Sequence, residues 1–405
     1  MEATTLPKET GLAEQDLTLL NLVQEELLRQ GIQPPAWRAD GRERETFRRR
    51  VEGILVRRVP PDDLPAATQR LTDAIVGVGL LSAYVRDDTI DEIYVRGEEV
   101  SVERAGRLER HVARAPISYW ESLIRRIADL SGRAIDPAYS AVLVDLPDGS
   151  RFTGLLPPVV EQPAINIRRF KSTALTLDQL EALGAFDSPP LENVQPVEAA
   201  TSPRTWLEQA IAGQNENILI AGEFSSGKTT LLSALTAAIP STAPVAVLET
   251  FHELQLPQNL YVVRGVVPAE RNPGETGADM GWLLNTIYTR ANPGVILVGE
   301  IVSPGEAMEF VKAANLGRRA YATIHGASVH AALGRLETLA LGRQPELGLA
   351  AVRRMVVDGI SVVVHMRKSA GGHRYLHEIA RLKGTDARDD YILETLYKAS
   401  GNERP

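Results

Sequence analysis

The stretch "NILIAGEFSSGKTTLLSAL", residues 217–235, decides the fold of the C-terminal half of the chain. An apolar run leads into Gly222, four residues separate it from Gly227-Lys228-Thr229, and an apolar pattern typical of a helix follows. Glycines let a backbone wrap closely around phosphate groups, and the amide groups at the start of a helix point at the anion. Because a strand precedes the loop and a helix follows it, the stretch predicts a nucleotide-binding loop.

The residue types in this loop have separate tasks in phosphate chemistry. Lys228 would reach the β- and γ-phosphates, and the Thr229 hydroxyl would ligate Mg²⁺. Glu223 stands just after the first glycine of the loop, where its carboxylate would repel phosphate unless the side chain points outward. The pattern predicts these nucleotide-binding residues: Gly222, Ser225, Ser226, Gly227, Lys228, Thr229 and Thr230.

Charged and polar side chains follow three other apolar stretches. Glu300 ends "GVILVGE", Glu249 and Glu253 lie in "VLETFHELQL", and His325 lies in "YATIHGAS". The carboxyl ends of parallel strands meet at one edge of a sheet, so we expect these groups to share one crevice with the loop. Phosphoryl transfer needs a carboxylate there to handle Mg²⁺ and water, and Glu300 fits this task. Thr229 and Glu300 are therefore the predicted metal ligands.

The C-terminal half alternates apolar strands with longer helical patterns. The strands read "NILIAG", "VAVLET", "VILVGE", "AYATIH" and "ISVVVHM". Strands that are apolar throughout, separated by helices, predict a mainly parallel sheet that is covered on both faces. The predicted fold class of this half is α/β.

The N-terminal half has a different texture. Residues 1–58 predict a helical extension, whose apolar stripe packs on its own domain or docks onto a partner. Residues 59–170 mix short alternating strands with helices and predict a small α+β domain. The proline-rich segment 187–203 is typical of a linker, so we assign residues 171–203 to a hinge and residues 204–405 to the α/β domain. The apolar stripe consists of Leu17, Leu20, Val23 and Leu27.

Composition limits the class of protein. The 405 residues include 44 basic and 52 acidic side chains, a formal net charge of −8, which disfavours a surface built to grip nucleic acid. The chain has no cysteine, which excludes disulfides, thiolate zinc sites and cysteine nucleophiles. No apolar run approaches the roughly 18 residues of a membrane-spanning helix, and the N-terminus lacks the basic-then-apolar order of a signal peptide. We therefore expect a cytoplasmic protein with no direct nucleic-acid partner.

Taken in order, these motifs resemble the secretion ATPases of the type II/type IV superfamily, the hexameric motors of pili and secretion systems. The resemblance is closest to the tight-adherence (Tad) pilus motors, of the CpaF-like kind, and covers roughly residues 75–385. In the C-terminal half it rests on the phosphate loop, "ETFHELQL", "VILVGE", "ATIHGAS", "ALGRLETLAL" and "AVRRMVVDGISVVVHMRK". In the N-terminal half it rests on "DDTIDEIYVRGEEVSVERAGRLER" and "LPDGSRFTGLLPPVVEQPAINIRRF".

The resemblance implies a RecA-like P-loop ATPase domain behind a smaller α+β domain. It makes Glu253 the general base or water-positioning group, with Glu249 beside it, Glu300 the Walker B acid and His325 a γ-phosphate sensor. Two arginines of the small domain would reach across to the phosphates, and cations on a mobile domain couple chemistry to motion. The alternative is that these two arginines only form surface ion pairs. They are Arg151 in "DGSR" and Arg168 in "INIRRF".

The same resemblance implies ATP and Mg²⁺ as ligands, a hexameric ring and a polytopic inner-membrane platform protein as partner, so that the motor associates peripherally with that membrane. The sequence departs from the family at Glu223, at Thr250, where Asp is common, and at Val302, where an arginine is usual. Two alternatives stay open: a catalytically weak relative that binds nucleotide to organise such a machine, and a nucleic-acid motor. We expect a working ATPase.

Overall fold

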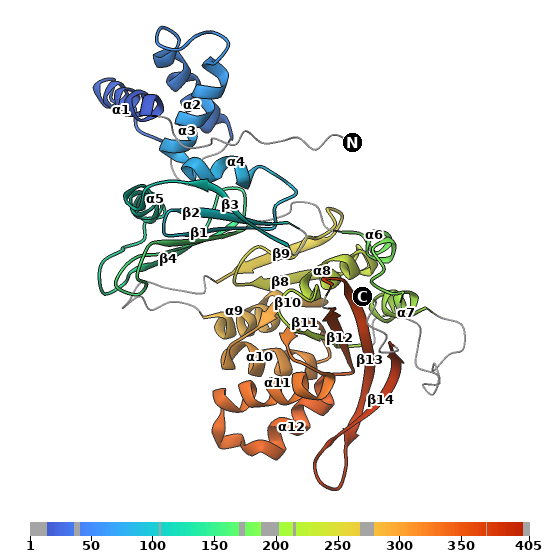
Figure 1. The fold of residues 1–405 in the computed structure, drawn as a ribbon. Coiled ribbons are helices and arrows are strands. Elements are labelled where there is room, and N and C mark those ends of the chain that lie inside the picture. Colours follow the sequence, from blue (N-terminus) through green and yellow to red (C-terminus); the bar gives the residue numbers. More distant parts are fainter. Residues whose placement is uncertain are drawn as a thin grey trace. The chain divides into compact units, whose positions relative to one another are not determined.

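The computed structural model describes residues 14–35, 41–104, 107–169, 175–187, 202–213, 216–267, 279–369 and 371–399. The chain divides into two compact units, Met1–Lys171 and Ser172–Pro405, and each unit contains its own β-sheet (Figure 1). No helix within these described ranges is both long and apolar enough to cross a bilayer.

Three helices begin the first unit and form a hydrophobic cluster of their own: α1 (Glu14–Arg29), α2 (Gly41–Leu55) and α3 (Leu64–Val76). Val23 and Leu27, two members of the predicted apolar stripe, are buried in this cluster against Val51 of α2 and Leu71 of α3. The stripe therefore packs within its own unit. The helix α3 lies in this cluster although it falls in the range 59–170, which we assigned to the α+β domain.

The rest of the first unit is a six-stranded antiparallel sheet in the order β3-β2-β1-β6-β5-β4, with α5 (Ile117–Leu130) packed on one face. Buried and half-buried residues alternate along β1, β4 and β5, because neighbouring side chains of a strand point to opposite faces. One face therefore forms the core with Trp120 and Ile124 of α5, and the other, called the open face below, carries half-buried and exposed residues. The strands are β1 (Glu92–Arg96), β2 (Glu99–Arg104), β3 (Arg107–Arg114), β4 (Ala141–Asp145), β5 (Arg151–Leu155) and β6 (Ala164–Arg168), and short helical turns η1 (Gly79–Leu81) and α4 (Ser82–Val85) precede them.

The second unit contains an eight-stranded sheet in the order β14-β13-β12-β7-β11-β10-β8-β9. Its strands from β12 to β9 are parallel to their neighbours, while β13 and β14 continue it as an antiparallel hairpin. All residues of β7 are buried, as expected for a strand that is covered on both faces. The strands are β7 (Ile218–Gly222), β8 (Pro244–Glu249), β9 (Tyr261–Val266), β10 (Val295–Ile301), β11 (Arg319–His325), β12 (Val362–Lys368), β13 (Arg374–Thr385) and β14 (Tyr391–Lys398).

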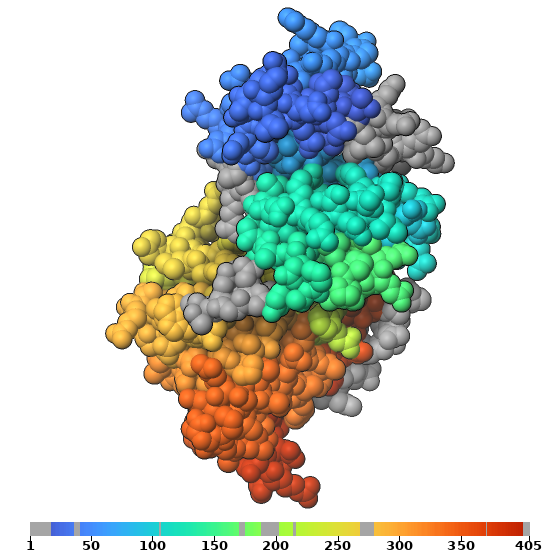
Figure 2. Space-filling model, turned by 90° about the vertical axis from the view of Figure 1, so that its left-hand side faces the viewer, coloured from blue at the N-terminus to red at the C-terminus, as the bar shows by residue number. Residues whose placement is uncertain are grey.

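Helices cover both faces of this sheet with separate hydrophobic clusters. Figure 1 shows the helices of one face stacked beside the parallel strands, and the β13–β14 hairpin projects from the unit in Figures 1 and 2. The predicted α/β fold with a mainly parallel sheet is confirmed. One face carries α9 (Met280–Thr286) with its π-helical extension η3 (Ile287–Ala291), α10 (Pro304–Asn315), α11 (Val329–Arg343), η4 (Pro345–Leu347) and α12 (Gly348–Gly359); the other carries α6 (Leu177–Ala182), α7 (Pro203–Ala212), α8 (Lys228–Leu235) and η2 (Thr236–Ala238).

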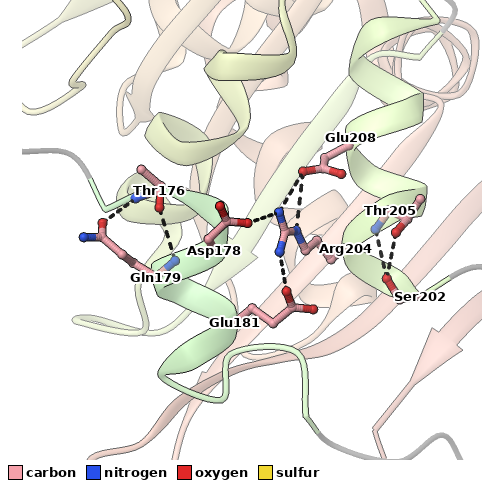
Figure 3. Close-up of polar contacts among 8 residues, drawn as sticks. All are labelled: Thr176, Asp178, Gln179, Glu181, Ser202, Arg204, Thr205 and Glu208. Carbon is pink, nitrogen blue, oxygen red and sulfur yellow. Dashed lines mark hydrogen bonds and ion pairs between the residues drawn. The ribbon is translucent and has the colours of Figure 1, made fainter.

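Helix α6 lies inside the predicted hinge, residues 171–203. Its Leu177 and Leu180 are buried in the core of the second unit, so this part of the segment belongs to the folded unit. Figure 3 shows how α6 is joined to α7: Arg204 of α7 pairs with Asp178 and Glu181 of α6 and with Glu208 of its own helix. Thr176 caps α6 and Ser202 caps α7 through side-chain oxygens.

Candidate functional site

The phosphate loop joins the end of β7 to the start of α8, as predicted. Ser225 and Gly227 have positive φ angles of 56° and 93°, which bend the backbone around the loop. A Cβ atom on Gly222 would lie 2.4 Å from Ser226 Oγ and 2.6 Å from the Met366 carbonyl oxygen, so only glycine fits there. No side chain caps the N-terminus of α8 at Gly227, and the amide groups of its first turn can therefore bind an anion.

Lys228 is buried, and its ammonium group lies inside this bend. Its Nζ donates hydrogen bonds to the carbonyl oxygens of Gly222 (3.2 Å) and Glu223 (2.9 Å), and it lies 3.3 Å from Nδ1 of His325. The Glu223 side chain is exposed. The loop thus uses the Glu223 backbone to hold Lys228 and leaves the side chain exposed, which weakens the expected charge repulsion between its carboxylate and phosphate.

His325 connects Lys228 to Glu300. Its Nε2 lies 2.7 Å from Glu300 Oε1, while Nδ1 faces the lysine. An ammonium group can only donate, so Nδ1 must accept and the ring proton must sit on Nε2, facing the carboxylate. Burial, helped by Lys228 and opposed by Glu300, lowers the pKa of His325. This shift favours the neutral ring, which lies in a chain of contacts from Lys228 to Glu300.

Phe224 covers one face of the His325 ring. The two ring centroids lie 3.8 Å apart with an interplanar angle of 35°, although the phenyl group is itself 80% exposed. The contact limits the rotation of the imidazole ring.

A β-bulge in β10 directs Glu300 toward His325. The register between β10 and β11 shifts between Val298 and Ile301, and Thr323 Oγ1 of β11 donates a 2.6 Å hydrogen bond to the Gly299 carbonyl oxygen at this point. Bulges of this kind re-aim a side chain next to an active site.

The segment after Glu300 departs from the family because it serves as a helix cap. Ser303 is the N-cap of α10, Pro304 is its first residue, and Glu306 completes a capping box with Ser303. The backbone amide of Val302 also donates to the Glu306 carboxylate at 2.6 Å. The residues that replace the family's arginine thus fix the start of α10 beside the site.

Glu249 ends β8 and is fully buried. Its Oε1 accepts hydrogen bonds from the backbone amides of Glu253 (2.9 Å) and Leu254 (2.5 Å), and its Oε2 pairs with Arg264 of β9. Burial raises the pKa of this carboxyl group, against the lowering effects of Arg264 and the two amides. Gly299 of β10 leaves room for it, because a Cβ atom there would lie 3.0 Å from Glu249 Cγ. The geometry makes Glu249 a group that positions the backbone at Glu253.

The remaining predicted residues lie at the same edge of the sheet or in the first turn of α8. Glu253 follows β8 and is half-buried, as are Thr229 and Thr230, while Ser226 is buried and its Oγ makes no hydrogen bond.

The described residues contain no group of three or more carboxylate, histidine or cysteine side chains that could hold a metal. Mg²⁺ needs no such group, since it binds through one or two protein ligands, water and substrate phosphates. Thr229 and Glu300 offer a hydroxyl and a carboxylate oxygen, which are ligand types that suit Mg²⁺.

Arg151 and Arg168 belong to the first unit, where the strands place them side by side. They are directly paired across β5 and β6, with Glu92 opposite Arg168 on β1 and Asp145 opposite Arg151 on β4. This row lies on the open face of the sheet, away from α5. Each arginine therefore lies between one like charge and one carboxylate on the neighbouring strands.

The sequence did not reveal the parts played by Arg264, Phe224 and Arg374. A single arginine in the apolar stretch "YVVRGV" was the available signal for Arg264. Phe224 was visible only as a departure from the family. Arg374 carries no signal of its own, yet its Nε donates a 2.9 Å hydrogen bond to the Ser225 carbonyl oxygen of the loop.

Comparison with known proteins gives consistent matches. Residues 145–367 match the family described as "Type II/IV secretion system protein". The chain is 30% identical over 295 residues to "Probable conjugal transfer protein TrbB" of Sinorhizobium fredii, covering 71% of this chain and 82% of that protein. It is 28% identical over 352 residues to "Type IV secretion system protein VirB11" of Brucella suis, covering 79% of this chain and 93% of that protein.

Among solved structures, the fold resembles the pilus retraction motor PilT with bound ADP. The identity is 14%, the TM-score is 0.50, and the match covers 79% of this chain and 83% of the other. At this identity the likeness concerns the fold alone. The family match spans more than half of the chain and includes the phosphate loop, the strand ends and the paired arginines. The predicted class, a secretion ATPase, is confirmed, and the chain belongs to the type II/IV secretion system protein family.

Proposed function

We propose that this protein hydrolyses MgATP at the loop before α8 and uses the energy to drive a pilus-assembly or secretion machine. The observation that carries the proposal is the continuous set of contacts from Lys228 through His325 to Glu300, at the strand edge where Glu249 holds the backbone of Glu253. Phosphoryl transfer needs charge stabilisation and positioned groups, and this edge supplies both.

Each side chain has a task in this proposal. Lys228 and the amides of the loop hold the phosphates, and Glu253 orients the attacking water. Neutral His325 donates through Nε2, so that a phosphate oxygen can replace Glu300 as its acceptor when the nucleotide binds. Thr229 and Glu300 would hold Mg²⁺, which would supply charge neutralisation at the phosphate oxygens.

We also propose that Arg151 and Arg168 stabilise the phosphate charge that develops during hydrolysis. Their pairing on an open face supports this, because two adjacent guanidinium groups form a site for a multivalent anion. The first unit would then follow the state of the nucleotide and pass it on as motion.

At the level of the machine, we propose a hexamer at the cytoplasmic side of the inner membrane, bound there through a polytopic platform protein. The sequence motifs support a place among the tight-adherence pilus motors. The names of the relatives instead concern conjugal transfer and type IV secretion. Stimulation of the ATPase by the cytoplasmic part of a candidate platform protein would separate these branches.

The proposal is tested by phosphate release from MgATP with wild type, Lys228→Ala and the control Lys383→Ala. Lys383 is half-exposed on β13 and pairs with Glu394, so its loss changes charge equally without touching the loop. We expect Lys228→Ala to lose activity about 100-fold or more, and Lys383→Ala to match wild type. Equal rates for wild type and Lys228→Ala would favour a nucleotide-binding scaffold, and strong stimulation by DNA at moderate salt would favour a nucleic-acid motor.

A further inference from the structure

The C-terminal hairpin reaches the phosphate loop through Arg374, the first residue of β13. Its Nε donates a hydrogen bond of 2.9 Å to the carbonyl oxygen of Ser225, a residue 149 positions earlier in the chain. The stem of the same side chain lies along the loop: its Cδ is 3.5 Å from the point where a Cβ atom on Gly227 would stand. Arg374 therefore binds Ser225 and lies beside Gly227.

The loop is strained at the residue that Arg374 holds. Ser225 has a φ of 56°, in the left-handed region that glycine adopts freely and other residues adopt at a cost. Such a conformation persists only where the surroundings determine it. The Ser226 amide donates a 3.3 Å bond to the Glu223 carbonyl oxygen, which closes the turn, and Arg374 is the side chain that fixes the Ser225 carbonyl group.

The position of Arg374 also leaves the anion side of the loop free. Phosphate-binding loops present amide N–H groups to the anion. Arg374 binds a carbonyl oxygen, so it supports the loop without taking an amide that phosphate needs.

We propose that Arg374 is a positioning residue for nucleotide binding: it holds the phosphate loop in its binding conformation, which makes the C-terminal hairpin a part of the nucleotide site. This inference rests on the proposed function of the loop. It predicts that nucleotide affinity depends on the hydrogen bond from position 374 and on the strain at position 225.

Two substitutions separate the hydrogen bond from the positive charge. Arg374→Gln keeps an N–H donor at the same number of bonds from Cα and loses the charge, whereas Arg374→Met keeps the length and loses both. By isothermal titration with MgADP, we expect Arg374→Met to weaken binding about tenfold, the size of one charge-assisted hydrogen bond, and Arg374→Gln to stay within about threefold of wild type. In steady-state ATP hydrolysis, the loss should appear in KM more than in kcat.

The variant Ser225→Gly tests the role of the backbone strain at position 225 directly. In Ser225→Gly the loop reaches φ > 0 without cost, so adding Arg374→Met should weaken MgADP binding by less than about threefold. Arg388→Met, at the exposed turn of the hairpin, is the control and should match wild type.

The outcomes are decisive in each case. Wild-type affinity in Arg374→Met, an Arg374→Gln variant as weak as Arg374→Met, or an undiminished loss in the Ser225→Gly background would each overturn the proposal. If wild type itself bound MgADP no better than Lys228→Ala, the proposed function of the loop would fail instead. If Arg374→Met is unstable, Arg374→Gln is compared with wild type directly, and a loss of more than about tenfold in a folded Arg374→Gln variant would overturn the proposal.

Discussion

The two sheets of this protein place their polar side chains in different ways. In the first unit, buried and half-buried residues alternate along the strands, and charged groups such as Glu92 and Arg168 lie along an open face. In the second unit, the central strands are buried throughout, and charged groups such as Glu249 and Glu300 stand only at the strand ends. An open face tolerates charge, whereas a sheet covered on both faces confines it to one edge, where each group must have partners.

The largest expected effect is on the free energy of unfolding, and it tests whether charged groups in the two sheets differ in their need for partners. Glu249→Ala leaves the half-buried Arg264 without its carboxylate and two backbone amides without their acceptor, and should cost about 3–5 kcal/mol of unfolding free energy. Glu92→Ala, on the open face, removes acceptors for Tyr94 and Asn166 and should cost about 1 kcal/mol or less. Denaturant unfolding of both variants measures the difference. Equal costs would show that the two sheets do not differ in this respect.

The next effect concerns catalysis at the buried edge. Glu300→Gln keeps the shape of the side chain but removes the charge that faces His325 and would bind Mg²⁺. We expect kcat to fall about 10²–10³-fold, with MgADP affinity changed far less and unfolding free energy within about 1 kcal/mol of wild type. Phosphate release at saturating ATP measures the first quantity. A wild-type kcat in this variant would show that Glu300 has no catalytic role.

A smaller effect on activity, with little effect on stability, is expected on the open face. Arg151→Ala or Arg168→Ala should lower kcat/KM about 10–100-fold, the range for one charge-assisted contact. Each arginine also lies opposite a carboxylate, Asp145 or Glu92, so the relief of the like-charge pair and the loss of this neighbour should nearly cancel, and the melting temperature should change little. Arg96→Ala is the matched control, since Arg96 lies on the same face of β1, opposite Ala164, and should leave activity unchanged. Loss of stability with unchanged kcat/KM would show that the two arginines only form surface ion pairs.

The smallest effect is a pH dependence of stability in the second unit. Burial, together with His377, lowers the pKa of His365 to about 4, and burial with Arg367 and Lys398 lowers that of His377 to about 4. In the unfolded chain both titrate near 6.5, so between these values the unfolded state binds more protons and stability falls as the pH drops from 6.5 to 4.

The substitution His365→Asn isolates one of these two groups. It should reduce the slope of unfolding free energy against pH by about 1 kcal/mol per pH unit between pH 6.5 and 5. Urea unfolding at several pH values measures this slope. An unchanged slope would show that His365 does not titrate between the folded and unfolded states.

The features that the sequence predicted are those with a local signal. The phosphate loop follows from glycine spacing within eight residues, and the central parallel strands follow from short runs that are apolar throughout. Three strands escaped prediction. The outer strands β9, β13 and β14 carry polar residues among apolar ones, as in "RYLHEIARLKGT" of β13, because they lie toward the edges of the sheet and are less covered.

The geometry of the site depended on contacts between distant parts of the chain. Sequence patterns predicted that Glu249, Glu300 and His325 stand at strand ends, because parallel strands share one edge. They could not show that Glu249 pairs with Arg264, nor that Arg374 holds Ser225, since such contacts depend on how strands are ordered in the sheet. The helix α6 was missed for a related reason: four prolines nearby suggested a linker, while Leu177 and Leu180 pack into a core formed by residues far along the chain.

The most direct test of the central claim is a structure of the protein with Mg²⁺ and a non-hydrolysable ATP analogue. We predict a triphosphate against residues 222–229, with its γ-phosphate in hydrogen-bond reach of Lys228 and His325, Mg²⁺ between Thr229 and Glu300, and both Arg151 and Arg168 on phosphate oxygens. A nucleotide bound elsewhere, a bend filled by the Glu223 carboxylate, or both arginines remote from every phosphate would contradict the account.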